Sequence, residues 1–198
     1  MGINVTLLHK KEKHAIIIVG QKKGGITIMP KGIEIERKYI ISMPDVGKLS
    51  LQPAYTVSRI TQIYIESEAG VTHRVRERAF SERIQHTETK KIRIDKMSVQ
   101  ELEREISEDE YNSLLPRVKK GTKPIYKTRH TFEHLGKTIE IDIYPNWKRS
   151  CIMETELEYR DEEVILPSFI KILREVTGDR SYSNAGMAES FPPEIITE

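Results

Sequence analysis

Three ionisable residues at alternate positions, Glu34, Glu36 and Lys38, form the chain's first clear chemical pattern. On a β-strand alternate side chains project from one face, and their Cα atoms lie about 7 Å apart. Two carboxylates at this distance can share a hard cation such as Mg²⁺, and the lysine can neutralise a phosphate oxygen. Such a short pattern recurs by chance in charged chains, so its meaning depends on the rest of the chain.

The same spacing recurs farther along the chain in blocks of one charge sign. The acidic blocks comprise Glu101, Glu103 and Glu105; Glu140 and Asp142; and Glu154, Glu156 and Glu158. The basic blocks comprise Arg74, Arg76 and Arg78; Lys91 and Arg93; and Lys127 and Arg129. A face that only meets solvent usually mixes the two signs. Because guanidinium groups grip phosphate oxygens through paired hydrogen bonds, the basic blocks are candidates for binding a polyanion.

About eight β-strands must position these residues, because polar and apolar residues alternate along each segment. The segments are 33–40, 62–65, 74–78, 89–94, 101–106, 125–132, 139–143 and 153–159. A capping box from Ser107 to Glu110 predicts a helix that ends at Pro116. A second helix is expected from Pro167 to Gly178, and a loop or one short helix over 43–53.

Alternation does not say which face of the strands points inward, and two arrangements stay open. In a sandwich the charged faces meet water and the apolar faces form the core, as in most half-exposed antiparallel sheets. In a barrel the apolar faces can instead lie outside beneath the helices, around an interior that holds side chains or one small ligand. Because an unpaired buried charge costs several kcal/mol, a charged interior must contain water, metal ions and a polyanion.

The composition of the 198 residues narrows the classes of protein that fit. Charged residues make up 31% of the chain, yet 32 Lys and Arg against 30 Asp and Glu leave a formal net charge of +2. This balance argues against a nucleic-acid coat or a polybasic membrane binder. The single Cys151 excludes an intrachain disulfide and a cysteine-rich zinc site. The apolar run 15–19 is too short to cross a bilayer, so we expect a cytoplasmic protein.

Taken in order, these segments resemble the CYTH superfamily of triphosphate tunnel metalloenzymes over roughly residues 33–190. Glu34, Glu36 and Lys38 are similar to the family's opening Glu-x-Glu-x-Lys strand. The further elements of the likeness are Gln62 and Tyr64; Arg74 and Arg76; Thr89 and Lys91; Glu103 and Glu105; Lys127-Thr128-Arg129; Glu140 and Asp142; Glu156 and Glu158; and the closing segment 178–184. We therefore expect a tunnel domain over 33–198 and an N-terminal extension of unknown role over 1–32.

The fold that the resemblance implies is α+β and dominated by strands. It is a closed antiparallel eight-stranded β-barrel, a tunnel with a charged interior and a few covering helices. The resemblance thus favours the arrangement in which the charged faces point inward.

The resemblance also implies roles for the ionisable residues. The implied cofactor is Mg²⁺ or Mn²⁺, with the metal ligands Glu34, Glu36, Asp142, Glu156 and Glu158. The implied substrate-binding residues are Arg74, Arg76, Lys91, Lys127 and Arg129, with Glu103 and Glu105 holding the arginines in position. Lys38 and Tyr64 are expected to orient or deprotonate the attacking water. Glu101 and Glu154 are expected at the rim.

The activity implied by the resemblance is metal-dependent hydrolysis of a triphosphate to diphosphate and phosphate, with inorganic tripolyphosphate as the leading substrate. Three alternatives stay open: a class IV-type adenylate cyclase, an RNA or nucleoside 5′-triphosphatase, and a non-catalytic polyphosphate-binding module. The expected partner is a small triphosphate, with no stable nucleic-acid complex and no membrane. A homodimer is compatible with the resemblance.

Overall fold

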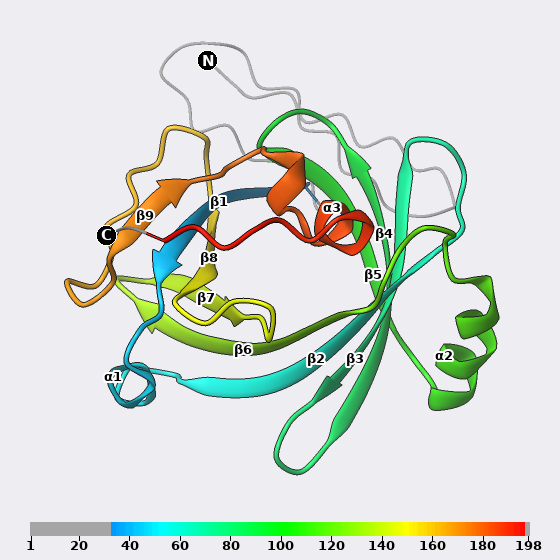
Figure 1. Cartoon of the computed structure of the whole chain (residues 1–198), viewed down its shortest axis with the longest axis horizontal. Helices are drawn as coiled ribbons and strands as arrows, with labels where there is room; N and C mark the ends of the chain where they lie inside the picture. Colours follow the sequence, from blue (N-terminus) through cyan, green and yellow to red (C-terminus); the bar gives the residue numbers. More distant parts are fainter. Residues whose placement is uncertain (1–32, 197–198) are drawn as a thin grey trace, which may run out of the picture. The chain divides into compact units, whose positions relative to one another are not determined.

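Nine strands make up one antiparallel sheet in the computed structural model, which describes residues 33–196 (Figure 1). In chain order the strands are β1 (Ile33–Ser42), β2 (Thr56–Ile65), β3 (Val71–Ala79), β4 (Ile84–Arg93), β5 (Ser98–Ile106), β6 (Ile125–His134), β7 (Lys137–Ile143), β8 (Ser150–Leu157) and β9 (Ile172–Glu175). Each of the strands β1 to β8 overlaps one of the segments in which alternation predicts a strand, although β2 and β4 begin five or six residues earlier than predicted. The extension expected over residues 1–32 lies outside the described residues.

The strands follow one another in the sheet in the order β5-β4-β3-β2-β6-β7-β8-β1-β9. Strand β1 also pairs with β5, through residues 33–35 and 98–100, so that β1 to β8 form a ring of paired strands. This pairing is short, whereas β1 pairs with β8 continuously from Ile35 to Ser42. The expectation of a strand-dominated antiparallel fold is therefore confirmed.

A two-residue turn joins β6 to β7, and both of its residues, Leu135 (φ 49°) and Gly136 (φ 76°), have positive φ. Positive φ at both positions is the pattern of a type I′ turn, whose twist matches that of antiparallel strands. The turn fixes the register of the hairpin, in which Arg129 lies opposite Asp142.

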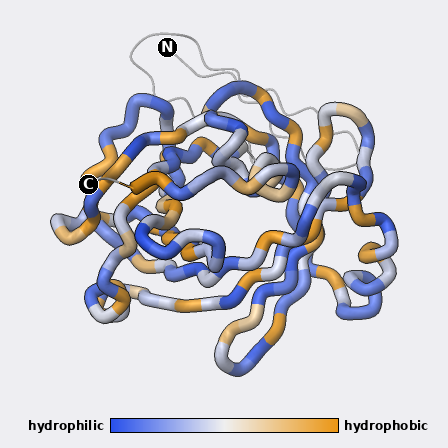
Figure 2. Tube along the Cα trace, in the orientation of Figure 1, coloured by the Kyte–Doolittle hydropathy of each residue, from blue (hydrophilic) through white to orange (hydrophobic). Residues whose placement is uncertain are grey.

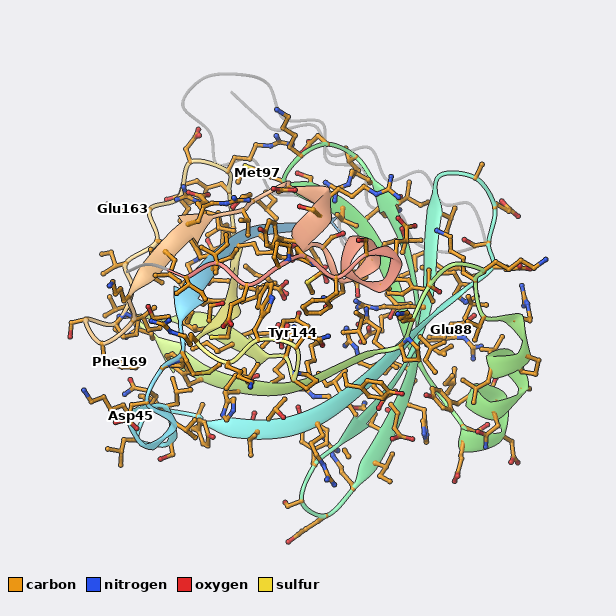
Figure 3. All side chains as sticks on the ribbon, viewed as in Figure 1. Asp45, Glu88, Met97, Tyr144, Glu163 and Phe169 are labelled. Carbon is orange, nitrogen blue, oxygen red and sulfur yellow. The ribbon has the colours of Figure 1, made fainter. Side chains whose placement is uncertain are left out.

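The inner faces of the ring are ionisable at one end and apolar at the other. We call the apolar end the inner apolar cluster; its buried members are Ile40, Tyr64, Ile125, Tyr144, Trp147, Ile152, Val176, Tyr182, Met187 and Ala188. Tyr144 lies within the ring of strands in Figure 3. Several of the members belong to the C-terminal segment 176–196, which crosses the ring in Figure 1.

Hydrogen bonds join the C-terminal segment to the loop between β7 and β8, which contains Trp147. The Trp147 indole N–H donates to the carbonyl of Pro192 at 3.1 Å. One carboxylate oxygen of Glu194 accepts from the backbone N–H groups of Lys148 and Ser150, at 2.9 and 2.7 Å. Trp147 therefore serves as a packing anchor for this segment.

Two further apolar clusters lie on the outer faces of the ring. The first contains Tyr39, Ile41, Leu49, Phe132, Ile139, Ile141, Cys151 and Met153, and the second contains Ile65, Val75, Ile106 and Tyr111. Hydrophilic and hydrophobic residues interleave along the strands in Figure 2. The apolar faces thus point outward and the charged faces point inward, as in the second of the two arrangements considered above.

Residues 33–196 contain three α-helices: α1 (Val46–Ser50), α2 (Glu108–Leu114) and α3 (Asn184–Glu189). Helix α2 begins with the predicted capping box: Ser107 Oγ accepts from the Glu110 N–H at 3.1 Å, and the Glu110 carboxylate accepts from the Ser107 N–H at 3.0 Å. Helix α1 falls within the predicted loop or short helix over 43–53. Among these described residues, no helix has the length and apolar character that a membrane span requires.

The helix expected from Pro167 to Gly178 is wrong, because this segment forms a turn and then strand β9 on the edge of β1. Its apolar residues do not share one face. Phe169 packs against the first outer cluster, whereas Leu173 and Val176 pack in the inner apolar cluster. The open edge of β1, which the local sequence does not reveal, overrides the helical spacing.

Candidate functional site

A cavity of about 990 Å³ occupies the ionisable end of the ring interior, and all eight strands of the ring line it. The residues predicted to carry chemistry that line this cavity are Glu34, Glu36, Lys38, Tyr64, Arg74, Arg76, Lys91, Glu103, Arg129 and Glu156. The charged residues Arg78, Arg93, Glu101, Glu140 and Glu154 line it as well. The structure therefore brings most of the predicted site into one enclosed space.

Carboxylates dominate the wall formed by β1 and β8. Glu36 lies opposite Glu156 in the register of these two strands. Burial, followed by repulsion from Glu140 and Glu36, raises the pKa of Glu156 above its usual range. Burial is also the main reason why the pKa of Glu34 rises to about 7. Lys91 lies 3.4 Å from Glu34 and Lys38 lies 3.4 Å from Glu36, but each lysine is shared with a second carboxylate, Glu101 or Glu154.

This acidic wall has the donor chemistry that a hard divalent cation prefers. The wall offers only oxygen ligands, and a divalent cation would relieve the repulsion between its carboxylates. No three His, Cys, Asp or Glu residues among those described already stand in a metal-binding arrangement. Glu34, Glu36 and Glu156 therefore fit Mg²⁺ or Mn²⁺ as an open set of carboxylates, which leaves room for water and phosphate oxygens.

Arginines dominate the opposite wall, on β3, which stands four places from β8 in either direction around the ring. An Arg74 Nη atom lies 3.2 Å from Glu101, and an Arg76 Nη atom lies 3.7 Å from Glu103. The Nε atoms of both arginines are buried and have no hydrogen-bond partner. Burial, followed by repulsion from Arg74 and Arg129, lowers the pKa of Arg76 to about 10. An anion in the cavity would supply the missing partner.

A fully paired ion network lies at the boundary between the cavity and the inner apolar cluster, where Tyr64 belongs to both. Arg129 donates to both carboxylate oxygens of Asp142, at 2.7 and 2.6 Å, and to Glu154 at 3.0 Å. It also pairs with Glu140. Lys127 Nζ donates to Asp142 at 2.5 Å. Each charge in this network is balanced within the protein.

The network corrects the roles predicted for Asp142 and Lys127. Both side chains are completely buried, and neither lines the cavity. The Asp142 oxygens are occupied by Arg129 and Lys127, so they are not free to bind a metal ion. The Lys127 ammonium is likewise paired and does not face a substrate. Asp142 holds Arg129 in place, and Lys127 pairs with the same Asp142 carboxylate.

Two further predicted site residues lie outside the cavity. Glu105 is exposed and accepts a hydrogen bond from Gln85 Nε2 at 3.3 Å. Glu158 is exposed, follows the end of β8, and its backbone N–H donates to Glu162 at 2.8 Å. Both residues keep the inward phase of their blocks, but they lie beyond the stretch of strand that lines the cavity.

Two residues that were expected at the rim lie inside instead. Glu154 accepts from Lys38 Nζ at 2.7 Å and from Arg129, and its side chain is 11% exposed. Glu101 pairs with Arg74 and Lys91, and its side chain is 9% exposed. The signal that could have found them is their phase: Glu101 alternates with Glu103, and Glu154 alternates with Glu156.

Lys38 and Tyr64 both line the cavity, and both stay protonated near neutral pH. Burial lowers the pKa of Lys38, but Glu154 and Glu36 raise it by more, so the net direction is upward. Burial raises the pKa of Tyr64 to about 12, and its hydroxyl accepts from Gln62 Nε2 at 2.5 Å. These upward pKa shifts favour orienting a water molecule over deprotonating it.

A similar arrangement of the chain is found in known structures. Neither a protein-family model nor a curated protein matches the chain. The structure of the inorganic triphosphatase NE1496 matches with 24% identity and a TM-score of 0.52, over 81% of this chain and 97% of that one. The PH1819 protein from Pyrococcus horikoshii OT3 matches with 22% identity and a TM-score of 0.52, over 65% of this chain and 80% of that one.

These likenesses agree with the strand-dominated antiparallel arrangement of the chain. At these levels of identity they concern the arrangement of the strands. The chemistry of this chain has to be argued from its own side chains.

Proposed function

We propose that this protein is a divalent-metal-dependent triphosphatase that hydrolyses inorganic tripolyphosphate to diphosphate and phosphate. The observation that carries the proposal is the division of one cavity into a carboxylate wall on β1 and β8 and an arginine wall on β3. A metal–triphosphate complex presents cationic and anionic groups side by side and complements such a cavity. The likeness in fold to a structure named as an inorganic triphosphatase supports the same conclusion.

The proposed reaction takes place in a closed tunnel formed by the eight strands of the ring. The pairing of β1 with β5 supports closure. An interior shielded by strands keeps bulk water away from the ions, which strengthens their electrostatic effect on the reacting phosphate.

The proposed phosphate-binding residues are Arg74, Arg76 and Lys91, together with Arg129, which lines the cavity and would have to exchange part of its pairing with Glu140 or Glu154 for a phosphate oxygen. Their guanidinium and ammonium groups neutralise the charge that develops on the phosphate oxygens as the bond to the leaving diphosphate breaks. Glu101, Glu103 and Glu154 hold these cations in position. Water supplies the oxygen of the new P–O bond, and the bridging oxygen leaves with the diphosphate.

Glu34, Glu36 and Glu156 are the proposed ligands of Mg²⁺ or Mn²⁺. When bound, the metal lowers the pKa of a coordinated water and offsets phosphate charge. Lys38 extends from the same wall, within 3.4 Å of Glu36. We assign to Lys38 and Tyr64 the orientation of the attacking water.

The cavity lining favours a compact substrate over a nucleotide. Among the Phe, Tyr and Trp residues described, only Tyr64 lines the cavity, and its side chain is buried and hydrogen-bonded. A nucleobase is commonly held by stacking on an exposed aromatic side chain. Inorganic tripolyphosphate needs no such surface.

A phosphate-release assay with tripolyphosphate, ATP and thiamine triphosphate, each with Mg²⁺, Mn²⁺ or EDTA, tests the proposal. We expect metal-dependent release that is fastest with tripolyphosphate and about 10²-fold slower in Glu36→Gln, because metal-held charge contributes several kcal/mol to such reactions. Glu133→Gln, at an exposed residue outside the cavity, is the matched control.

Other outcomes would redirect or remove the proposal. Cyclic AMP formed from ATP would indicate a cyclase, and release from 5′-triphosphorylated RNA would indicate an RNA triphosphatase. Tight tripolyphosphate binding in calorimetry without phosphate release would indicate a binding module. An absence of both binding and release would remove the proposal.

A further inference from the structure

One edge of β1 changes partner near its middle. Residues 33–35 pair with β5, and residues 39–41 pair with β9 (Figure 1). Between these pairings, the backbone N–H of Glu36 donates to the carbonyl of Met97 (labelled in Figure 3) at 3.4 Å. The backbone at Lys38 therefore has no paired strand residue on this edge.

A threonine side chain takes the place of that missing strand. Thr177 Oγ1 accepts the backbone N–H of Lys38 at 3.0 Å, and the Val176 N–H donates to the Lys38 carbonyl at 2.8 Å. The Thr177 hydroxyl donates in turn to Glu175 at 2.8 Å. Two hydrogen bonds of 3.0 Å from Arg37 fix the Glu175 carboxylate. The orientation of the hydroxyl is therefore set by a chain of fixed groups.

The turn that contains Thr177 packs closely against the loop between β4 and β5. Gly178 has a φ of +74°, and a Cβ at this position would lie 2.8 Å from the carbonyl oxygen of Lys96. A small hollow of about 20 Å³ remains beside Thr177, Glu36 and Lys38. This hollow has room for about one water molecule. Without the hydroxyl, only solvent remains to accept the Lys38 N–H.

We propose that Thr177 is a positioning residue that holds the backbone of Lys38 and so aims its ammonium group into the cavity. The inference rests on the proposed function, in which Lys38 orients the attacking water. The Lys38 ammonium is already confined by Glu154 at 2.7 Å and Glu36 at 3.4 Å. A shift of its backbone would move it relative to both carboxylates.

The test compares Thr177→Val, which keeps the shape and removes the hydroxyl, with Thr177→Ser, which keeps the hydroxyl. In Thr177→Val we expect kcat to fall roughly tenfold or more, because misplacement by about 1 Å can cost 10²-fold. KM should change by less than about twofold, because Lys38 is assigned to the water and not to ground-state binding. Thr177→Ser should stay close to wild type, as should Ser181→Ala, which removes an exposed hydroxyl bonded to Asp179.

A second readout, amide hydrogen exchange at Lys38, does not depend on catalysis. The exchange rate should rise roughly fivefold in Thr177→Val, because the loss of one hydrogen bond of about 1 kcal/mol changes an equilibrium constant by roughly this factor. In Thr177→Ser the exchange rate should be unchanged. Far-UV circular dichroism checks that both variants are folded.

The outcomes separate this inference from the proposed function. Equal kcat values in Thr177→Val and wild type, or equal losses in Thr177→Val and Thr177→Ser, would overturn the positioning role. Unchanged exchange at Lys38 in Thr177→Val would overturn it too. If the wild type hydrolyses no triphosphate, the proposed function fails, and the exchange comparison still decides whether Thr177 holds Lys38.

Discussion

The two ends of the ring interior are built on the same strands, yet they differ completely in chemistry. On β1 the inward residues run from Glu34, Glu36 and Lys38 to Ile40, and on β8 Glu156 and Glu154 are followed by Ile152. The change from ionisable to apolar residues occurs at the same position on both strands, because Lys38 lies opposite Glu154 and Ile40 lies opposite Ile152. One end is filled by apolar side chains, several of them from the C-terminal segment, whereas the other is a cavity lined mainly by charged side chains.

The pairing of ionised side chains differs between the cavity and its boundary with the apolar end. At Arg129 and Asp142 each ion has a partner within the chain. Toward the cavity, Glu156 faces Glu36, and the Arg76 Nε atom has no partner. Buried ions that are paired stabilise a single geometry, and ions that lack partners mark where a ligand completes the balance.

The largest expected effect comes from breaking the paired boundary with Asp142→Asn. The substitution keeps the shape but leaves Lys127 and Arg129 buried without their carboxylate. We expect the free energy of unfolding, measured by chemical denaturation, to fall by about 3–5 kcal/mol. A loss below about 1 kcal/mol would mean that the boundary is not a closed network.

Met187→Ala tests the apolar end. Met187 is 2% exposed and packs in the inner apolar cluster, so its truncation leaves a cavity. We expect a loss of about 3 kcal/mol in the free energy of unfolding. The KM for tripolyphosphate in the folded variant should match wild type, and a raised KM would show that the two ends are not independent.

Ligand addition tests the charged end as a whole. Mg²⁺ with tripolyphosphate at about 100 times its dissociation constant should stabilise the fold by about 2.7 kcal/mol, because the ligands bind only the folded state. Thermal unfolding measures the shift. The shift should persist in Met187→Ala and disappear in Arg76→Met, and equal shifts in both variants would contradict the placement of the site.

Glu156→Gln should have the smallest effect on stability. It is the same acid-to-amide change as Asp142→Asn, but it removes a carboxylate from a repulsive group that is partly screened by water. We expect the free energy of unfolding without metal to stay within about 1 kcal/mol of wild type or to rise. If the free energy of unfolding fell as much as in Asp142→Asn, the carboxylates of the cavity would be as important for stability as the paired boundary, and the comparison would be wrong.

Much of the fold follows from local alternation, because each strand of the ring has one apolar and one polar face. The helix from Pro167 to Gly178 was predicted wrongly, since strand β9 depends on an open edge of β1 far away in the sequence. Phase also predicted which residues share one face, including Glu36, Arg76 and Glu156, whereas the inward direction of that face came from the resemblance to the CYTH superfamily.

Phase could not show how far along the axis of the ring each inward residue lies. Glu105 and Glu158 have the correct phase and lie beyond the cavity, whereas Glu101 and Glu154 were placed at a rim and lie inside. The pairing of Asp142 with Lys127 and Arg129 depends on the register of the β6–β7 hairpin. Depth and register are properties of strand pairing, and spacing within one segment does not contain them.

The C-terminal cover has a consequence for how the protein is made. Tyr182, Met187 and Ala188 are synthesised after every strand of the ring. A nascent chain that has been synthesised only as far as β8 therefore leaves part of the inner apolar cluster exposed to solvent. The cluster can be completed only after the C-terminal segment has docked, and until then part of the apolar surface stays exposed.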